Sequence, residues 1–235
     1  MNLIRTSLAT LLVAAAATTT IAAVTKLSDK FTSSTLSSLW SAYADGDTTM
    51  SPSGGALNAN AAGPGTAAVV IEGYLLNSGS WKASVAARQV LAASALDGES
   101  SIHAFMGLQY GPIVDGVDLG DQANGYLIGA DIYSDAAYVG WSERQDGVDV
   151  DGDEMETSNA RPLAGNIVVT YTSTKDRLVI QAGRYKQTFS MFLGSSAFVD
   201  DANVYLGAQA EGGATGRIFT FDNFALSGAG VASAQ

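Results

Sequence analysis

The feature that most constrains the fold is a regular alternation of apolar residues between Asn166 and Phe192. A first run alternates up to Thr172, the polar residues 173–176 suit a turn, and a second run ends at Gly183, after which a third run follows. Successive side chains of a strand point to opposite faces of its sheet, so a period of two predicts strands and excludes an amphipathic helix. The segment therefore predicts three antiparallel strands in a meander.

The same pattern recurs between clusters of Gly, Asn, Asp and Ser. Further strands are expected at Ala67–Glu72, Trp81–Leu91, Ser101–Gln109, Gly125–Ile132, Ala137–Glu143 and Val204–Ala210. Only Ser33–Tyr43 weakly resembles a helix, and it would form a short helix or an irregular entry. The glycine-rich Ser51–Ala68 suits a hairpin as well as a tether. About ten to twelve strands in about 205 residues predict one all-β domain of two antiparallel sheets, as a jelly roll, an immunoglobulin-like sandwich or a barrel.

The first 23 residues have the layout of a secretory signal peptide. A basic residue, Arg5, precedes an apolar run from Leu8 to Ala17, and small residues suit cleavage after Ala22 or Ala23. That run holds about ten residues, whereas a membrane-spanning helix needs about 20. We therefore expect a secreted protein, extracellular, on the cell surface or in the periplasm. Its folded domain would span 24–228, followed by a short tail, 229–235.

Composition excludes several classes of function. The chain has no cysteine, which excludes disulfides, cysteine-bound zinc and a thiol nucleophile. Its formal net charge is −11, and loss of Arg5 with the signal peptide makes it more negative. Nucleic-acid binding needs clustered Lys and Arg, so we expect no nucleic-acid partner. No segment after the signal peptide is apolar enough to predict a membrane span, while an acidic surface is compatible with divalent cations.

The alternation changes phase within Gly216–Gly228. Phe219 and Phe221 share one parity, but the next apolar residues, Phe224 and Leu226, have the opposite parity. A change of phase turns the apolar side chains to the other face unless the strand inserts an extra residue. A β-bulge is therefore predicted at Asp222-Asn223.

Three segments, in order along the chain, resemble the concanavalin A-like lectin/glucanase jelly-roll superfamily, in particular its laminin-G-like bacterial members. They are Asp29-Lys30-Phe31 with Leu36 and Leu39-Trp40; Ser53-Gly54-Gly55-Ala56-Leu57; and Val204-Tyr205-Leu206-Gly207 leading to Phe221-Asp222-Asn223-Phe224-Ala225-Leu226. Together they span nearly the whole mature chain. The resemblance implies a two-sheet antiparallel jelly-roll sandwich.

The resemblance also implies a structural Ca²⁺ near the first and last strands. Asp222 and Asn223 would supply oxygen ligands from the bulge, and Asp29 would be their partner on the opening strand. The alternative is that the bulge ends sheet pairing and Asp222 caps a turn.

The densest acidic segment is Glu143–Glu156, where Asp149, Asp151 and Asp153 have the spacing of calcium-binding loops. Such loops need a glycine directly after the third acid and a glutamate seven positions beyond it, but Glu154 and an alanine occupy these positions. The segment is therefore not an EF-hand. It forms a solvated hairpin tip, a nonstandard cation site or a catalytic acid pair.

Two enzymatic alternatives come from the same superfamily. Its glucanases carry E-x-D-x-x-E on one strand, and this chain lacks that spacing. Its alginate lyases use a histidine, a tyrosine and an arginine, for which His103, Tyr185 and Arg88 are the partial matches. The motif around Arg88 is absent, and Ser101 replaces the glutamine of the lyase motif. Enzymatic activity thus stays open, and the non-catalytic interpretation is preferred.

Sugar binding without catalysis needs aromatic faces together with amide and carboxylate groups. Trp141, Tyr138 and Trp81 are the candidates. We therefore expect a secreted, non-catalytic, lectin-like module that binds a polysaccharide or another glycan, with calcium as a structural ion. The alternatives are a structural subunit of an extracellular coat or filament, which would form homo-oligomers, and, third, a polysaccharide lyase or hydrolase.

Overall fold

A computed structural model describes residues 25–110, 124–145, 148–157, 164–190 and 202–234. Within these ranges the chain forms 15 strands and two short 3-10 turns. The strands are β1 (Thr25–Asp29), β2 (Trp40–Ser53), β3 (Ala56–Ile71), β4 (Tyr74–Leu76), β5 (Trp81–Gln89), β6 (Ser101–Tyr110), β7 (Gly125–Tyr133), β8 (Ala137–Gln145), β9 (Val148–Thr157), β10 (Ala164–Thr172), β11 (Arg177–Ala182), β12 (Tyr185–Ser190), β13 (Ala202–Glu211), β14 (Gly216–Gly228) and β15 (Val231–Ser233). Among the described residues there is no helix that could span a membrane. The predicted signal peptide lies outside the described residues.

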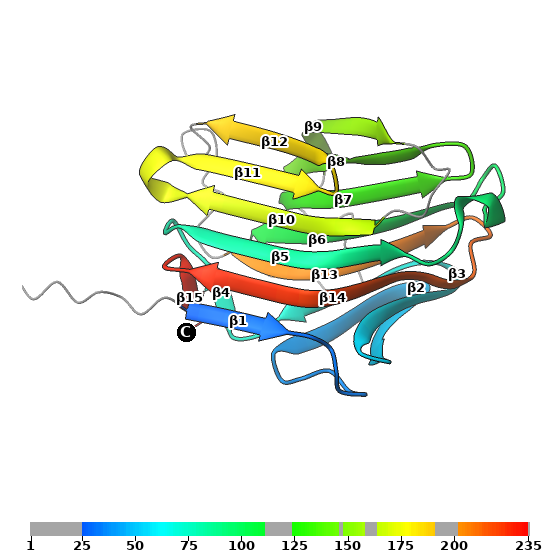
Figure 1. Cartoon of the computed structure of the whole chain (residues 1–235), viewed down its shortest axis with the longest axis horizontal. Helices are drawn as coiled ribbons and strands as arrows, with labels where there is room; N and C mark the ends of the chain where they lie inside the picture. Colours follow the sequence, from blue (N-terminus) through cyan, green and yellow to red (C-terminus); the bar gives the residue numbers. More distant parts are fainter. Residues whose placement is uncertain (1–24, 111–123, 146–147, 158–163, 191–201, 235) are drawn as a thin grey trace, which may run out of the picture.

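The strands form two layers packed face to face (Figure 1). The first sheet has the order β12-β11-β10-β5-β14, with β1 paired to β14. The second sheet has the order β13-β6-β7-β8-β9. The long strands β2 and β3 connect the two layers, because β3 pairs with β14 over 57–61 and with β13 over 65–70. The predicted all-β antiparallel sandwich with a jelly-roll fold is confirmed.

The bend that carries β3 from one sheet to the other needs glycine. Gly46 and Gly65 face each other across the β2–β3 pair and have φ values of +73° and +154°. A Cβ on Gly46 would lie 2.5 Å from the Pro64 carbonyl oxygen, and one on Gly65 would lie 2.4 Å from the Asp45 carbonyl oxygen. Both contacts are to backbone, so a side chain at either position would push the bent strands apart. The predicted glycine-rich hairpin within Ser51–Ala68 is therefore part of the sandwich.

The predicted meander is confirmed as β10, β11 and β12. Their alternate residues face the second sheet, and Val169, Leu178 and Ile180 are buried there. Every strand expected from alternation is present. The count of ten to twelve was too low because β1, β4 and β15 are too short, and β9 too acidic, to show an apolar repeat.

A helix within Ser33–Tyr43 is wrong, and the irregular entry is found instead. β2 begins at Trp40, and the residues before it form bends and turns. The Asp29 carboxylate holds this entry: Oδ1 accepts from the Phe31 N–H at 2.6 Å. Oδ2 accepts from the Ser37 hydroxyl at 2.8 Å and from the Trp40 Nε1–H at 3.0 Å. Local hydrogen bonds of this kind compete with helix formation.

The predicted bulge in β14 is also confirmed. The register between β14 and β5 shifts between Asp222 and Ala225, and Asn223 adopts a left-handed φ of 53°. The shift lets Phe221 and Phe224 face the core on the two sides of the bulge, with exposed fractions of 0% and 1%. The bulge thus lets the apolar residues before it and after it face the same core.

This left-handed position leads to a stability prediction. Asn223→Val should lower the free energy of unfolding by about 1–2 kcal/mol, because a β-branched residue is poorly tolerated at positive φ. Asn223→Gly, which adopts this φ freely, should change stability by less than about 1 kcal/mol. Urea denaturation of both variants measures the difference. Equal losses would show that the side-chain contacts of Asn223 matter more than its backbone conformation.

Candidate functional site

The candidate site lies on the outer face of the second sheet, where three glycines lie in one row across neighbouring strands. The pairing register places Gly207, Phe105, Gly129 and Gly140 next to one another on β13, β6, β7 and β8. Glu154 of β9 follows Gly140 in the same row. Because Gly129 and Gly140 have no side chains, the sheet surface above them is open. This opening is a hollow of about 220 Å³.

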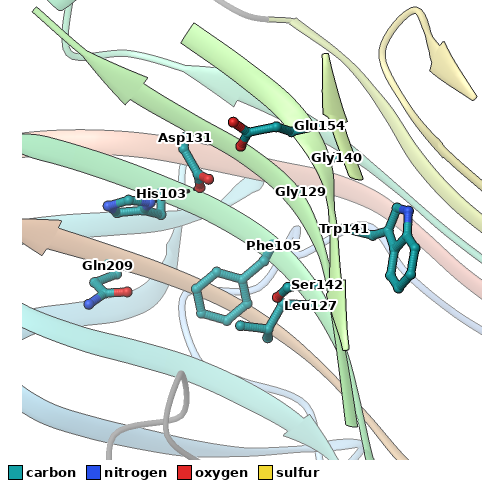
Figure 2. A pocket seen from close by; sticks show the side chains of 10 residues that line it. All are labelled: His103, Phe105, Leu127, Gly129, Asp131, Gly140, Trp141, Ser142, Glu154 and Gln209. Atoms are coloured by element: carbon teal, nitrogen blue, oxygen red, sulfur yellow. Dashed lines mark hydrogen bonds and ion pairs between the residues drawn. The ribbon is translucent and has the colours of Figure 1, made fainter. Parts of the chain in front are cut away.

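The hollow has two chemically different walls (Figure 2). Phe105, Leu127 and Ser142 lie at one side, and His103, Asp131 and Glu154 lie at the other. Gln209 lies beside His103 on the neighbouring strand. The apolar wall continues into a small cluster of buried residues on the outer face, which contains Phe105 and Tyr205 together with Ala68 and Val70.

A chain of hydrogen bonds runs through His103 and Asp131 of the charged wall and crosses three strands. His103 Nδ1 lies 2.7 Å from Asp131 Oδ1, and Nε2 lies 2.8 Å from the Ser101 hydroxyl. Ser101 donates its proton to Glu211 Oε2 at 2.7 Å. Since the hydroxyl proton is already used, Nε2 must donate to Ser101, while Nδ1 donates to Asp131. Both ring nitrogens then carry protons, and His103 is an imidazolium.

The pKa values of the residues in this hydrogen-bond chain agree with a charged His103. Burial lowers the pKa of His103, but hydrogen bonding and charge attraction from Asp131 and Glu211 more than reverse this effect and raise it to about 9. In turn, the contact between Glu211 and His103 and the hydrogen bond from the Ser101 hydroxyl lower the pKa of Glu211 to about 2. A histidine protonated at neutral pH cannot accept a proton, so it positions the carboxylates instead.

Two tyrosines extend the charged wall. Tyr133 contacts the His103 ring edge to face at 6.1 Å between ring centroids, and it contacts Tyr138 in the same way at 6.0 Å. Tyr133 is 37% exposed, and Tyr138 is half-buried. Burial and the negative charges of Asp131, Glu211 and Glu154 raise the pKa of Tyr133. One exposed and one half-buried tyrosine ring therefore lie next to the charged wall.

The three aromatic residues expected to bind sugar have different positions. Tyr138 lies opposite Asp131 in the β7–β8 ladder, next to the charged wall. Trp141 borders the hollow, but its ring points away from the other side chains (Figure 2) and is 7% exposed. Trp81 is 2% exposed and packs against Tyr171 in the core, so its ring is unavailable for stacking. Alternation assigned these residues to strands, but burial depends on the face to which each ring points.

The lyase residues lie on three different surfaces. His103 is at the outer face of the second sheet. Arg88 is exposed on the first sheet, on the face opposite to the buried Val85 and Ala87. Tyr185 is 6% exposed, and its hydroxyl donates to Asp153 Oδ2 at 3.1 Å. Burial and Asp153 raise the pKa of Tyr185 to about 12. The structure does not bring His103, Tyr185 and Arg88 together.

The acidic segment forms the exposed β8–β9 hairpin. Asp151 and Asp153 pair with Glu143 and Trp141, on the face opposite to Glu154, so they face away from the hollow. A bulge between Asp149 and Asp151 pairs Asp149 with Arg144 instead. Asp149 forms an ion pair with Arg144 at 3.3 Å, and Asp153 accepts from Tyr185. Within the described ranges, no group of three acidic or histidine side chains has the spacing to hold a metal ion. The arrangement is that of a solvated hairpin strand.

Asp29 and Asp222 were expected to hold calcium. Asp29 pairs with Phe224 in the β1–β14 ladder, so the two aspartates are on adjacent strands. Both oxygens of Asp29 accept the hydrogen bonds of the entry segment. Both oxygens of Asp222 accept from Asn223, at 2.6 and 2.8 Å. Calcium needs six to eight oxygen ligands, and these carboxylates as arranged do not fit such a cage.

Several residues of the hollow and of the hydrogen-bond chain beside it were not singled out from the sequence: Phe105, Asp131, Gln209 and Glu211. Phe105, Asp131 and Gln209 lie on predicted strands and Glu211 directly follows one, with no motif around any of them. Their proximity depends on the register between strands that are far apart in sequence, such as β6 and β13. Asp131, Gln209 and Glu211 lie on other strands than His103, and the sequence does not relate the faces of different strands.

No protein-family model matches the sequence, and no curated protein matches it. Solved structures do resemble it. The Emp47p carbohydrate recognition domain is 13% identical, with a TM-score of 0.56, covering 86% of this chain and 94% of that one. The winged bean acidic lectin complexed with methyl-α-D-galactose is 10% identical, with a TM-score of 0.58, covering 89% and 100%. Lectin II from Ulex europaeus is 10% identical, with a TM-score of 0.59, covering 87% and 98%.

These similarities identify the architecture. The chain has the concanavalin A-like jelly-roll fold, as the three sequence segments predicted. At such low identity the likeness concerns the fold alone, and fold does not imply function. Function must be argued from the site.

Proposed function

We propose that the protein is a non-catalytic, lectin-like module that binds a glycan in the hollow over Gly129 and Gly140. The observation that carries this proposal is the pairing of an apolar wall with a hydrogen-bonding wall in one open hollow. A sugar ring has an apolar face of C–H groups and a rim of hydroxyls. Phe105 and Leu127 would contact the first, while Gln209 and the carboxylates would accept or donate hydrogen bonds to the second.

Two further observations support a binding role. The carbohydrate-binding names of the structural neighbours agree with it. The volume of about 220 Å³ is below that of drug-sized pockets, so the hollow has room for about one sugar ring. The protonated His103 and the scattered positions of Tyr185 and Arg88 argue against the lyase alternative.

Filling the hollow tests this proposal. Ser142 lies opposite Leu127 in the β7–β8 ladder and is half-buried. Ser142→Phe places a ring over the glycines, and we expect it to weaken retention on an insoluble polysaccharide by about tenfold or more, because a ligand and the ring cannot share the space. Co-sedimentation with a panel of polysaccharides measures this effect.

Ser84→Phe is the matched control. Ser84 is also a half-buried strand serine, but it lies on β5 in the first sheet, away from the hollow. It should retain full binding, and thermal unfolding should show that both variants are folded. If no polysaccharide retains the wild type, the glycan-binding proposal is wrong. If Ser142→Phe binds as well as the wild type, the site lies elsewhere.

Structural calcium stays a prediction separate from the hollow. If Ca²⁺ binds at Asp29 and Asp222, adding it should raise the melting temperature, and Asp222→Asn should remove this rise. Asp29→Asn should lower stability with or without calcium, because the three hydrogen bonds at its carboxylate are weakened. No shift in melting temperature with calcium would exclude the ion.

Export is part of the proposal, and it rests on the signal-peptide pattern of the first 23 residues. N-terminal sequencing of secreted protein should find Ala23 or Val24 as the first residue. The coat or filament alternative would use an exposed strand edge such as β9, where Val148 and Val150 are 62% and 50% exposed. The carboxylates along β9 oppose pairing of two such edges, because like charges would meet.

A further inference from the structure

We infer that the hollow selects a sugar that carries a protonated amine, such as a free hexosamine residue, over neutral and anionic sugars. This inference rests on the proposed function, because it takes a sugar to be the ligand. It concerns the charge of that sugar, which neither the fold nor the names of the structural neighbours specify.

The first step is the charge balance of the lining. Among the described residues around the hollow, His103 is the only cation, and the carboxylates are Asp131 and Glu154. The positive charge of His103 is already matched, since it contacts Asp131 at 2.7 Å and Glu211 at 3.6 Å. Glu154 therefore leaves the hollow with a net negative charge.

The second step is the availability of Glu154. It forms no hydrogen bond or ion pair within the described part of the chain, whereas Asp131 is held by His103. The register places Glu154 directly beside Gly140, so its side chain rises next to the open floor. Figure 2 shows its carboxylate at the same end of the hollow as that of Asp131. A ligand ammonium at this end would meet two carboxylates.

The third step is the chemistry of the ligand. An ammonium group bonded to a sugar ring donates three hydrogen bonds, which suits carboxylate acceptors, while the ring carbons suit Phe105 and Leu127. A uronic acid or a sulfated sugar would bring a negative charge toward the same carboxylates and be repelled. Burial raises the pKa of Tyr133, and the charges of Asp131, Glu211 and Glu154 raise it further, in agreement with a negative potential at this wall.

The experiment compares short oligosaccharides of equal length by isothermal titration calorimetry at pH 6 and low salt. The probes are an oligomer of glucosamine, the same oligomer N-acetylated, and an oligomer of galacturonic acid. We expect the glucosamine oligomer to bind about threefold to tenfold more tightly than the N-acetylated one, and the galacturonate oligomer to bind least. The preference should weaken at high salt.

Glu154→Gln tests the residue that carries the inference. It should weaken binding of the glucosamine oligomer about twofold to fivefold and leave the N-acetylated oligomer unchanged within about twofold. Asp151→Asn is the control, because Asp151 lies on the same strand, also exposed, but on the opposite face. A loss of the preference in both variants would overturn the inference, because it would reflect the overall acidity of the protein.

The outcomes separate this inference from the proposed function. Equal binding of the glucosamine and N-acetylated oligomers overturns the inference and leaves the glycan site in place. Binding of none of the sugars overturns both. A lysine tripeptide that binds as tightly as the glucosamine oligomer, with the same loss in Glu154→Gln, would also overturn the sugar assignment and point to a cationic peptide as ligand.

Discussion

Raising the pH from 6 to 9.5 is expected to remove most of a stabilising contribution of about 3 kcal/mol that His103 makes to folding. The folded-state pKa of about 9 lies above the ordinary value of 6.5, so the native state holds this proton more tightly than the unfolded chain does. The contribution is complete below pH 6.5 and is lost as the pH rises through 9. Its size follows from about 1.4 kcal/mol per pKa unit. The side chain is only 15% exposed, so solvent screens it little.

The measurement is urea unfolding of wild type and His103→Gln at pH 6, 8 and 9.5. The difference in the free energy of unfolding between the two proteins should be largest at pH 6 and should shrink toward pH 9.5. Comparing the two proteins at each pH cancels the titration of groups they share. Lys82→Gln, an exposed change on the first sheet, should show no such pH dependence. A difference that stays constant from pH 6 to 9.5 would mean that His103 is not charged in the folded protein.

Gly207→Ala is expected to destabilise the protein by about 2–3 kcal/mol, although it adds only one methyl group. A Cβ at this position would lie 2.0 Å from Cε2 and 2.4 Å from Cζ of Phe105. Phe105 is 5% exposed and packs against Tyr205 at 6.1 Å between ring centroids, so its ring has little space to move. Since Phe105 forms a wall of the hollow, a displaced ring should also weaken glycan binding.

A double-mutant cycle identifies the cause of this loss. In a Phe105→Ala background, Gly207→Ala should cost less than about 1 kcal/mol, because the ring that it would meet is gone. Gly98→Ala is the control for the general effect of replacing glycine, since a Cβ there has no neighbour within 4 Å. The same cost of Gly207→Ala in both backgrounds would show that backbone strain, and not Phe105, is responsible.

Much of the fold followed from the sequence. A period of two needs only local side-chain directions, so the meander at 166–192 could be predicted without tertiary information. The phase change after Phe221 predicted the bulge, because both phases had to reach one core. Ser33–Tyr43 was ambiguous since its few apolar residues suit either a helix or a loop, and the contacts of Asp29 decided for the loop.

The candidate site was predictable only in part. Tyr138 and His103 were singled out from the sequence, and both lie at or next to the charged wall, but a lyase role of His103 and a stacking role of Trp81 do not fit the structure. Phe105, Asp131, Gln209 and Glu211 carried no local signal. Their strands are separated by up to about a hundred residues, and only the pairing register makes them neighbours.

The all-β class, the acidic and cysteine-free chemistry, and the alternation of side chains along each strand could be predicted from the sequence, because these properties depend on composition and on local backbone geometry. Three features needed the folded structure: which face of each strand meets the core, which glycines align into an open hollow, and which carboxylates neutralise His103. These features depend on long-range pairing between strands, where a shift of one residue exchanges the two faces of a sheet.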